Sequence, residues 1–241
     1  GIGNLKNPDG NYTETKNQCI KLLLDTHFPD SSPSPNINLN TIAPISGRSE
    51  YYLMEKIFAP SKIIWSINSF QPFKSPGGDG IIPKMLQESL PHLTDTLTHI
   101  FNASFKLNYI PSLWRKVNVI FIPKPGKDPT DPKSFRPISL SSFLLKTMER
   151  LLDLHIRETI QNTLPLHNLQ FAYQKGKSTE LAVHHLVSRI ENSLQNKEIS
   201  LCAFMDIQGA FDNTGFGAIY NSLSNKNIDK HSINWILSML I

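Results

Sequence analysis

The chain has 241 residues, of which 39% are hydrophobic, and a formal net charge of +4. This composition suits a packed globular core, and no apolar run approaches the roughly 18 residues of a membrane span. The start also lacks the charged and apolar regions of a signal peptide, so we expect an intracellular protein without a membrane partner. The two cysteines, Cys19 and Cys202, lie far apart and indicate thiols, because neither a disulfide framework nor a zinc site is suggested.

The positive charge is concentrated in one stretch. Residues 106–150 hold nine Lys or Arg against three acids, a local +6 that exceeds the excess of the whole chain. Such a segment suits a phosphate-bearing partner, although a solvated protein face has the same composition.

The N-terminal residues read as a lead-in. Residues 1–45 are rich in Asn, Pro, Ser and Asp, with one apolar cluster at Cys19–Leu24 and a proline-broken linker over Pro29–Pro44. Helical spacing follows at Ser49–Phe58 and Lys62–Ser69.

A glycine-rich loop comes next. Lys74–Ile81 contains three glycines and a proline, which cannot continue a helix and predict a tight turn. Pro83 then opens a helix that reaches Leu90, and Pro91 is expected to open another.

The middle of the chain predicts a basic hairpin. Val117–Pro123 and Phe135–Leu140 read as strands joined by a polar loop rich in Pro, Gly and Lys. Two helices follow, Phe143–Ile160 and Thr179–Asn196, the second with Ser178 or Thr179 as its N-cap. Its inward face is expected to hold Val183, Leu186, Val187, Ile190 and Leu194.

A carboxylate ends the next apolar run. Every residue of Leu201–Met205 is apolar, which predicts a strand covered on both faces. A carboxylate at Asp206 is costly there unless it is paired or bound to metal, so a metal ligand is one explanation. The alternative is that Asp206 caps a turn and Phe211 is ordinary core. Helical patterns at Gly217–Leu223 and Ile233–Leu240 finish the chain.

The residues from Leu201 to Asp212, which end Asp-Ile-Gln-Gly-Ala-Phe-Asp, resemble the first catalytic motif in the palm of reverse transcriptases of LINE-type (non-LTR) retrotransposons, in a jockey-like form. The resemblance implies that Asp206 and the backbone carbonyl of Ile207 bind catalytic Mg²⁺ or Mn²⁺. It also implies that Phe211 lies under the nucleotide sugar and excludes a 2′-hydroxyl. An aromatic residue there disfavours a viral RNA-dependent RNA polymerase.

The hairpin carries a second resemblance to that family. Phe121-Ile-Pro-Lys-Pro-Gly-Lys127 followed by Phe135-Arg-Pro-Ile-Ser-Leu140 is similar to the fingers, where Lys124 and Arg136 would face the incoming triphosphate. Arg binds phosphate through a bidentate fork and Lys acts as a point charge. A hairpin kept soluble by its charges is the alternative.

A third resemblance covers Gln170–Thr179, where Ala172 and Gln174 replace a usual Gly and Arg. The basic tail precedes a helix N-terminus and implies contacts with a template or primer phosphate. A nucleotide-binding P-loop is excluded, because Phe171 stands where that motif requires Gly. The residues implied in nucleic-acid binding are Lys175, Lys177 and Ser178. Upstream, Ser75–Gly80 is similar to a Ser-Pro-Gly-x-Asp-Gly element of the family.

The order of elements predicts an α+β fold. The resemblance makes it a partial right-hand polymerase fold, with helical fingers, a β-hairpin and an incomplete palm sheet. The expected domains are a lead-in and linker at 1–45, a fingers region at 46–198 with the hairpin at 117–140, and the start of the palm at 199–241.

The implied function is RNA-directed DNA synthesis by two-metal phosphoryl transfer on an RNA template, a DNA primer and deoxynucleoside triphosphates. No Asp-Asp pair occurs in the chain, so we expect these residues alone to be inactive. The alternative is a non-catalytic, nucleic-acid-binding remnant. The resemblance implies a location in the cytoplasm and nucleus and leaves the oligomeric state open.

Overall fold

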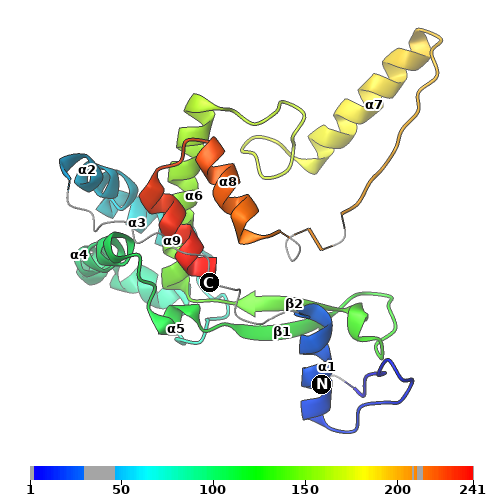
Figure 1. Cartoon of the computed structure of the whole chain (residues 1–241), viewed down its shortest axis with the longest axis horizontal. Helices are drawn as coiled ribbons and strands as arrows, with labels where there is room; N and C mark the ends of the chain where they lie inside the picture. The colour runs from blue at the N-terminus through cyan, green and yellow to red at the C-terminus, as the bar shows by residue number, and fades with distance from the viewer. Residues whose placement is uncertain (1–2, 30–46, 208, 211–213, 241) are drawn as a thin grey trace. The chain divides into compact units, whose positions relative to one another are not determined.

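The computed structural model describes residues 3–29, 47–207, 209–210 and 214–240. Within these residues it combines α-helices with one two-stranded antiparallel sheet, as Figure 1 shows. The chain divides into two compact units: unit 1 contains Gly1–His155 and Lys230–Ile241, and unit 2 contains Ile156–Asp229. The predicted mixture of helix and sheet is confirmed.

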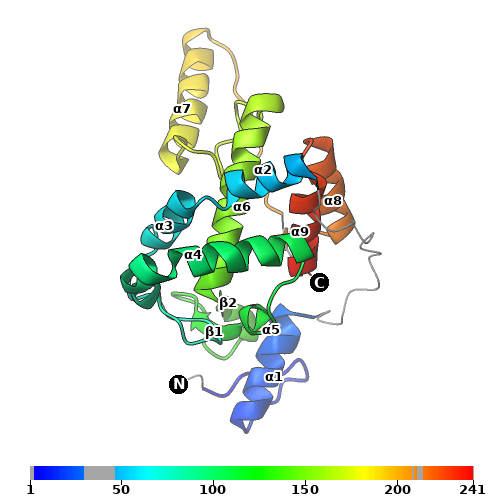
Figure 2. The ribbon, with the colours of Figure 1, turned by 90° about the vertical axis from the view of Figure 1, so that its left-hand side faces the viewer.

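Helices enclose the larger core of unit 1. They are α2 (Arg48–Ile57), α3 (Pro60–Asn68), α4 (Pro83–Leu107), the short α5 (Ser112–Arg115), the first part of α6 (Phe143–Thr163) and α9 (Lys230–Leu240). Helix α4 packs against α3 and contacts α9, an arrangement that can be followed in Figure 2. The fully buried members of this core include Ile57, Phe58, Ile63, Ile67, Phe101, Phe105, Met148 and Trp235.

Trp235 anchors α9 in this core. Its ring is fully buried, and its indole Nε1 donates a hydrogen bond to Ser104 Oγ at 3.2 Å. The Ser104 hydroxyl in turn donates to the carbonyl of Tyr109 at 2.6 Å. Because a buried polar group without a partner is costly, this relay lets the indole enter the core without leaving its N–H unpaired.

The proline inside α4 contradicts one prediction. Pro91 was expected to open a second helix, but a single helix runs from Pro83 to Leu107. An interior proline costs about 3 kcal/mol. The buried stripe of α4 continues on both sides of Pro91, through Leu90 and Leu97, and each fully buried Leu or Phe contributes about 1.5–3 kcal/mol. The free energy gained by burying this stripe therefore exceeds the cost of the proline inside the helix.

The predicted hairpin is confirmed. Strands β1 (Asn118–Pro123) and β2 (Phe135–Leu140) pair antiparallel, with Ile122 opposite Arg136 and Ile120 opposite Ile138. Their connection ends in a short 3₁₀ turn, η1 (Pro132–Ser134).

The lead-in contains a packed helix, α1 (Lys16–His27). A capping box starts it: the side chain of Thr15 accepts from the Gln18 amide, and the side chain of Gln18 accepts from the Thr15 amide. A second, smaller core joins this helix to the hairpin through Leu5, Cys19, Leu23 and Phe135. The predicted linker lies outside the described residues, apart from Pro29.

Unit 2 holds the last part of α6 with α7 (Thr179–Gln195) and α8 (Phe216–Asn225). The helices are as predicted, and Ser178 caps α7 by accepting from the Leu181 amide at 3.2 Å. The expected inward face of α7 is wrong, because none of its residues is buried. Helical periodicity defines an apolar face but does not supply an element to cover it.

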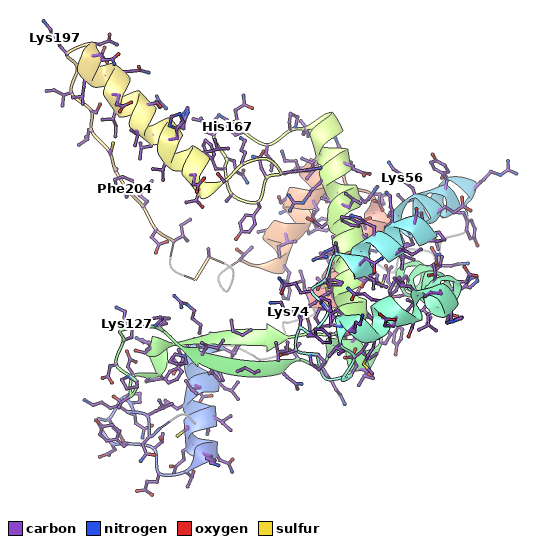
Figure 3. All side chains as sticks on the ribbon, turned by 180° about the vertical axis from the view of Figure 1, so that it is seen from behind. Lys56, Lys74, Lys127, His167, Lys197 and Phe204 are labelled. Atoms are coloured by element: carbon purple, nitrogen blue, oxygen red, sulfur yellow. The ribbon has the colours of Figure 1, made fainter. Side chains whose placement is uncertain are left out.

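The predicted buried strand is also wrong. Residues 201–207 form no strand, and Leu201, Phe204 and Met205 are 95%, 84% and 93% exposed. Figure 3 shows Phe204 on this extended stretch. A strand needs a neighbouring edge for its backbone groups, and in the described part of the chain β1 and β2 pair only with each other. Cys202, expected inside this strand, is an exposed thiol, whereas Cys19 is buried.

Candidate functional site

The hairpin has one packed face and one open face. Phe135 is buried and Phe121 half-buried, and both pack against the small core beneath α1. On the opposite face Ile120, Ile122 and Ile138 are 48%, 48% and 40% exposed. Because side chains alternate along a strand, the register places Arg136 on this open face beside the isoleucines.

Arg136 is exposed, directly after the buried Phe135. The position suits a contact with an anion, because the guanidinium reaches solvent while its neighbour in the strand is fixed in a core. Arg136 is thus accessible on the open face of the hairpin, and its contact with a triphosphate stays a prediction.

Lys124 lies where β1 runs into the connecting loop. Its backbone N–H donates to the carbonyl of Ser134 at 2.7 Å, and its ammonium donates to the carbonyl of Lys133 at 2.7 Å. An ammonium has three N–H donors, and this bond takes one of them. Lys124 is thus held by turn η1 and retains donors for a second partner.

The tip of the loop is ordered by Asp128. Its Oδ1 accepts from the backbone N–H and the hydroxyl of Thr130, each at 2.8 Å. These two bonds lower the pKa of Asp128 below its usual value of 3.8, and the backbone hydrogen bond from Thr130 has the larger effect. The neighbouring Lys127, labelled in Figure 3, is exposed at this end of the hairpin.

The glycine-rich loop Ser75–Gly80 lies at the other end of the hairpin. A Cβ on Gly77 would come within 2.6 Å of the backbone at Ser141 and Ser142, directly after β2. A Cβ on Gly78 would lie 3.2 Å from the Cβ of Lys116, just before β1. The predicted turn is confirmed by the bond from the Gly80 amide to the Gly77 carbonyl at 3.2 Å. Its close approach to both stems of the hairpin was not predicted.

The acidic candidate belongs to unit 2. Asp206 and Ile207 are exposed, and Phe211 lies outside the described residues. Lys124 and Arg136 belong to unit 1, so their meeting with Asp206 stays a prediction.

The expected metal site has few candidate ligands among the described residues. A carboxylate oxygen of Asp206 is the hard ligand that Mg²⁺ prefers. Among the residues that the structure describes, however, no three His, Cys, Asp or Glu side chains are grouped so that they could hold a metal ion. The described residues therefore offer single donors of a suitable kind, not a complete site.

The third candidate region uses its polar groups internally. The ammonium of Lys177 donates to the carbonyls of Asn168 and Gln170 and lies 5.1 Å from the centre of the Phe171 ring. Ser178 Oγ is engaged as the α7 cap. Of the three predicted contacts, Lys175 is an exposed cation on the loop.

Within the described ranges, no helix is both long and apolar enough to cross a membrane.

Comparison with known proteins identifies the family. Residues 122–241 match the family described as reverse transcriptase (RNA-dependent DNA polymerase). The chain is 34% identical over 151 residues, 63% of its length, to a probable RNA-directed DNA polymerase from transposon BS of Drosophila melanogaster. It is also 34% identical over 142 residues, 58% of its length, to the RNA-directed DNA polymerase from mobile element jockey of the same species.

A more distant relative, the Pol polyprotein from the type-2 retrotransposable element R2DM of Drosophila melanogaster, is 26% identical over 241 residues, 94% of this chain. The aligned regions cover only 17%, 16% and 22% of these three relatives. The match to the family begins inside β1 and includes the open face of β2 with Arg136. Residues 122–241 therefore match the reverse transcriptase family, and the chain is similar to RNA-directed DNA polymerases of jockey-like non-LTR retrotransposons.

Proposed function

We propose that this chain is the fingers region and the first catalytic motif of a retrotransposon polymerase that adds deoxynucleotides to a DNA primer on an RNA template. The observation that carries the proposal is the hairpin. Inside the matched region it places Arg136 on an open face while the other face is packed.

The hairpin cations would bind the triphosphate of the incoming nucleotide. Arg136 would bind two phosphate oxygens through its planar fork, and Lys124 would add a point charge from the start of the loop. The half-exposed isoleucines beside Arg136 would lie on one side of that contact. Both cations orient the substrate and stabilise charge that develops on the phosphates, without exchanging a proton.

Asp206, with the carbonyl of Ile207, would supply oxygen ligands to Mg²⁺ or Mn²⁺, which would stabilise the attacking and leaving oxygens when bound. Phe211 would lie against the sugar of the nucleotide. Lys175, Lys177 and Ser178 would contact the template or primer backbone. The functional division is the lead-in at 1–45, the fingers at 46–198 and the first catalytic motif within 199–241, acting in the cytoplasm and nucleus.

Nucleotide binding tests the hairpin assignment directly. Titration of the chain with dTTP should give saturable binding that weakens about 10-fold or more in Arg136→Ala, because a charged hydrogen bond contributes about 1.5–3 kcal/mol. Arg48→Ala, which removes an exposed Arg at the start of α2, is the control and should bind as the parent does. Equal affinity for all three proteins contradicts the assignment.

RNA binding tests the second region. Affinity for a short single-stranded RNA should fall steeply between about 50 and 200 mM salt, and Lys175→Ala should reduce the slope of log K against log salt by about 0.7. Lys56→Ala, at an exposed position of α2 labelled in Figure 3, should leave the slope unchanged. Affinity that does not respond to salt rules out phosphate contacts. Salt-dependent binding without dTTP binding favours a non-catalytic, nucleic-acid-binding role.

Primer extension separates binding from catalysis. We expect these 241 residues alone not to extend a primer, because Asp206 is one carboxylate and the two-metal mechanism needs more. Magnesium-dependent extension by the chain, lost in Asp206→Ala, would contradict that expectation. In a longer chain that does extend primers, Phe211→Ala should relax discrimination against ribonucleotides, and unchanged sugar selectivity would reject the assignment of Phe211.

A further inference from the structure

A small folded element near the N-terminus, which lies before the family match, packs on the hairpin. Residues 3–28, here named the N-terminal brace, are organised by Thr13, whose side chain is buried. Thr13 Oγ1 accepts from the Leu5 amide at 2.8 Å and lies 2.9 Å from Cys19 Sγ. Together with α1, these bonds fold the start of the chain back on itself and place Leu5 and Cys19 in one apolar cluster.

That cluster is completed by the hairpin. Phe135, the first residue of β2, is buried among Leu5, Cys19 and Leu23. Successive side chains of a strand point to opposite faces, so a fixed Phe135 directs Arg136 to the open face. The brace thereby determines which way Arg136 points.

Two hydrogen bonds extend the contact along the loop of the hairpin. The Lys6 amide donates to the carbonyl of Thr130 at 2.8 Å, and His27 Nε2 lies 3.0 Å from the carbonyl of Pro132. A carbonyl only accepts, so Nε2 of His27 carries the hydrogen in this contact. The His27 ring also contacts Phe121, with ring centres 5.6 Å apart. Figure 1 shows α1 beside this end of the hairpin.

The bond from His27 reaches the turn that holds Lys124. Pro132, Lys133 and Ser134 form η1, and their three successive carbonyls accept, in order, from His27, from the Lys124 ammonium and from the Lys124 backbone amide. A shift of η1 therefore moves both anchors of Lys124. His27 is connected to Lys124 through one turn of backbone.

From these contacts we infer that the N-terminal brace positions the two triphosphate-facing cations, Arg136 through Phe135 and Lys124 through the His27–Pro132 hydrogen bond. The inference rests on the proposed function of the hairpin. It adds a role for residues outside the matched region, with His27 as a positioning residue that does not itself touch the nucleotide.

The test compares His27→Ala and His27→Gln in the full chain, with His92→Ala as the matched control on the exposed surface of α4. His27→Ala should weaken dTTP binding about 2- to 10-fold, the worth of one hydrogen bond. His27→Gln keeps an N–H donor and should restore most of the affinity. Hydrogen exchange of the amides of Lys124 and Phe135 should accelerate in His27→Ala alone, with an unchanged thermal midpoint of the helical core.

The possible outcomes distinguish failure of the positioning role from failure of the proposed nucleotide binding by the hairpin. If Arg136→Ala weakens dTTP binding as expected, but His27→Ala keeps full affinity and unchanged exchange, the positioning role is overturned and the nucleotide site stands. If His27→Gln binds as weakly as His27→Ala, a donor at position 27 is not what matters, and the role of His27 is likewise rejected. If the parent shows no dTTP binding, the nucleotide assignment fails first and the positioning role fails with it.

Discussion

The two units of the chain differ in what holds their elements. In unit 1 every α-helix except α1 contributes to one continuous core, which includes residues from both segments of the unit, such as Ile57 and Trp235. In unit 2 Ile228 is the only buried hydrophobic residue that the structure describes, and α7 and α8 have no buried residue. The helices of unit 2 are thus stabilised by local interactions such as capping, whereas those of unit 1 are stabilised by burial of apolar side chains.

This difference bears on the candidate site. Lys124 and Arg136 stand on a hairpin that is packed at its loop by α1 and approached at its stems by the glycine-rich loop. Asp206 and Lys175 stand on exposed segments of unit 2. Groups that must act with fixed geometry need neighbours that determine their orientation. The hairpin provides such neighbours in the described residues.

The largest expected change in stability comes from replacing an apolar residue in the core, compared with replacing one on the surface. Trp235→Ala should destabilise unit 1 by about 3–5 kcal/mol, because it removes a fully buried ring and the hydrogen bond to Ser104. Leu194→Ala in α7, where the side chain is 62% exposed, should change stability by no more than about 0.5 kcal/mol. Urea unfolding followed by circular dichroism measures both. Similar costs would contradict the contrast between the units.

Two glycines provide a second comparison. Gly77→Ala should cost about 1–3 kcal/mol, because the new Cβ would lie 2.6 Å from the backbone of Ser141 and Ser142. Gly217→Ala, inside α8 with nothing within 4 Å, should be neutral or stabilise by up to about 1 kcal/mol. Hydrogen exchange should show the loss in Gly77→Ala at the stems of the hairpin. A neutral Gly77→Ala would mean that the loop does not constrain those stems.

Local patterns in the sequence predicted the hairpin and most helices. The hairpin follows from short-range information, since two alternating strands flank a loop rich in turn residues. The start of α7 was predicted from the serine that precedes an apolar helical pattern. The capping box of Thr15 and Gln18 would also have predicted the start of α1.

Long-range contacts could not be predicted in this way. The strand at Leu201–Met205 needs a partner edge, which an apolar pattern does not supply. The approach of Gly77 to Ser141 and the contact of His27 with Pro132 join residues far apart in sequence. The family resemblance implied that Lys177 contacts nucleic acid, but it did not show that the Lys177 ammonium donates to the carbonyl of Gln170 in its own loop. Contacts of this kind depend on which segments of the chain meet in the folded structure.

Substitution of the N-cap residue of α7 tests how far local interactions stabilise the helices of unit 2. Ser178→Ala removes the acceptor for the Leu181 amide and should cost about 1 kcal/mol, seen as faster hydrogen exchange in the first turn of α7. Ser178→Asp keeps a capping oxygen and should preserve that protection. If a nucleic-acid phosphate contacts this helix end, the added charge of Ser178→Asp should lower RNA affinity, whereas Ser178→Ala should lower it less. Equal exchange in all three proteins would show that α7 does not depend on its cap.

The smallest expected effect concerns a charge at the edge of the core of unit 1. Burial raises the pKa of Glu149, in α6, above its usual value of 4.5, and Lys146 partly opposes the shift. The folded state then binds the proton more tightly than the unfolded state. The stability that this group contributes is therefore greatest below the usual pKa and falls as the pH rises through the raised value.

At neutral pH the ionised carboxylate of Glu149 thus opposes folding, and Glu149→Gln should raise the thermal midpoint by about 1–3 °C. The gain should shrink when the melts are repeated at pH values closer to 4.5, because the raised pKa makes the folded parent take up a proton more readily than the unfolded chain. Glu88→Gln is the control, since Lys84 lowers the pKa of the exposed Glu88 and this substitution should give no gain at either pH. A gain of equal size at both pH values would mean that packing, not the desolvated charge, distinguishes Glu149 from Glu88.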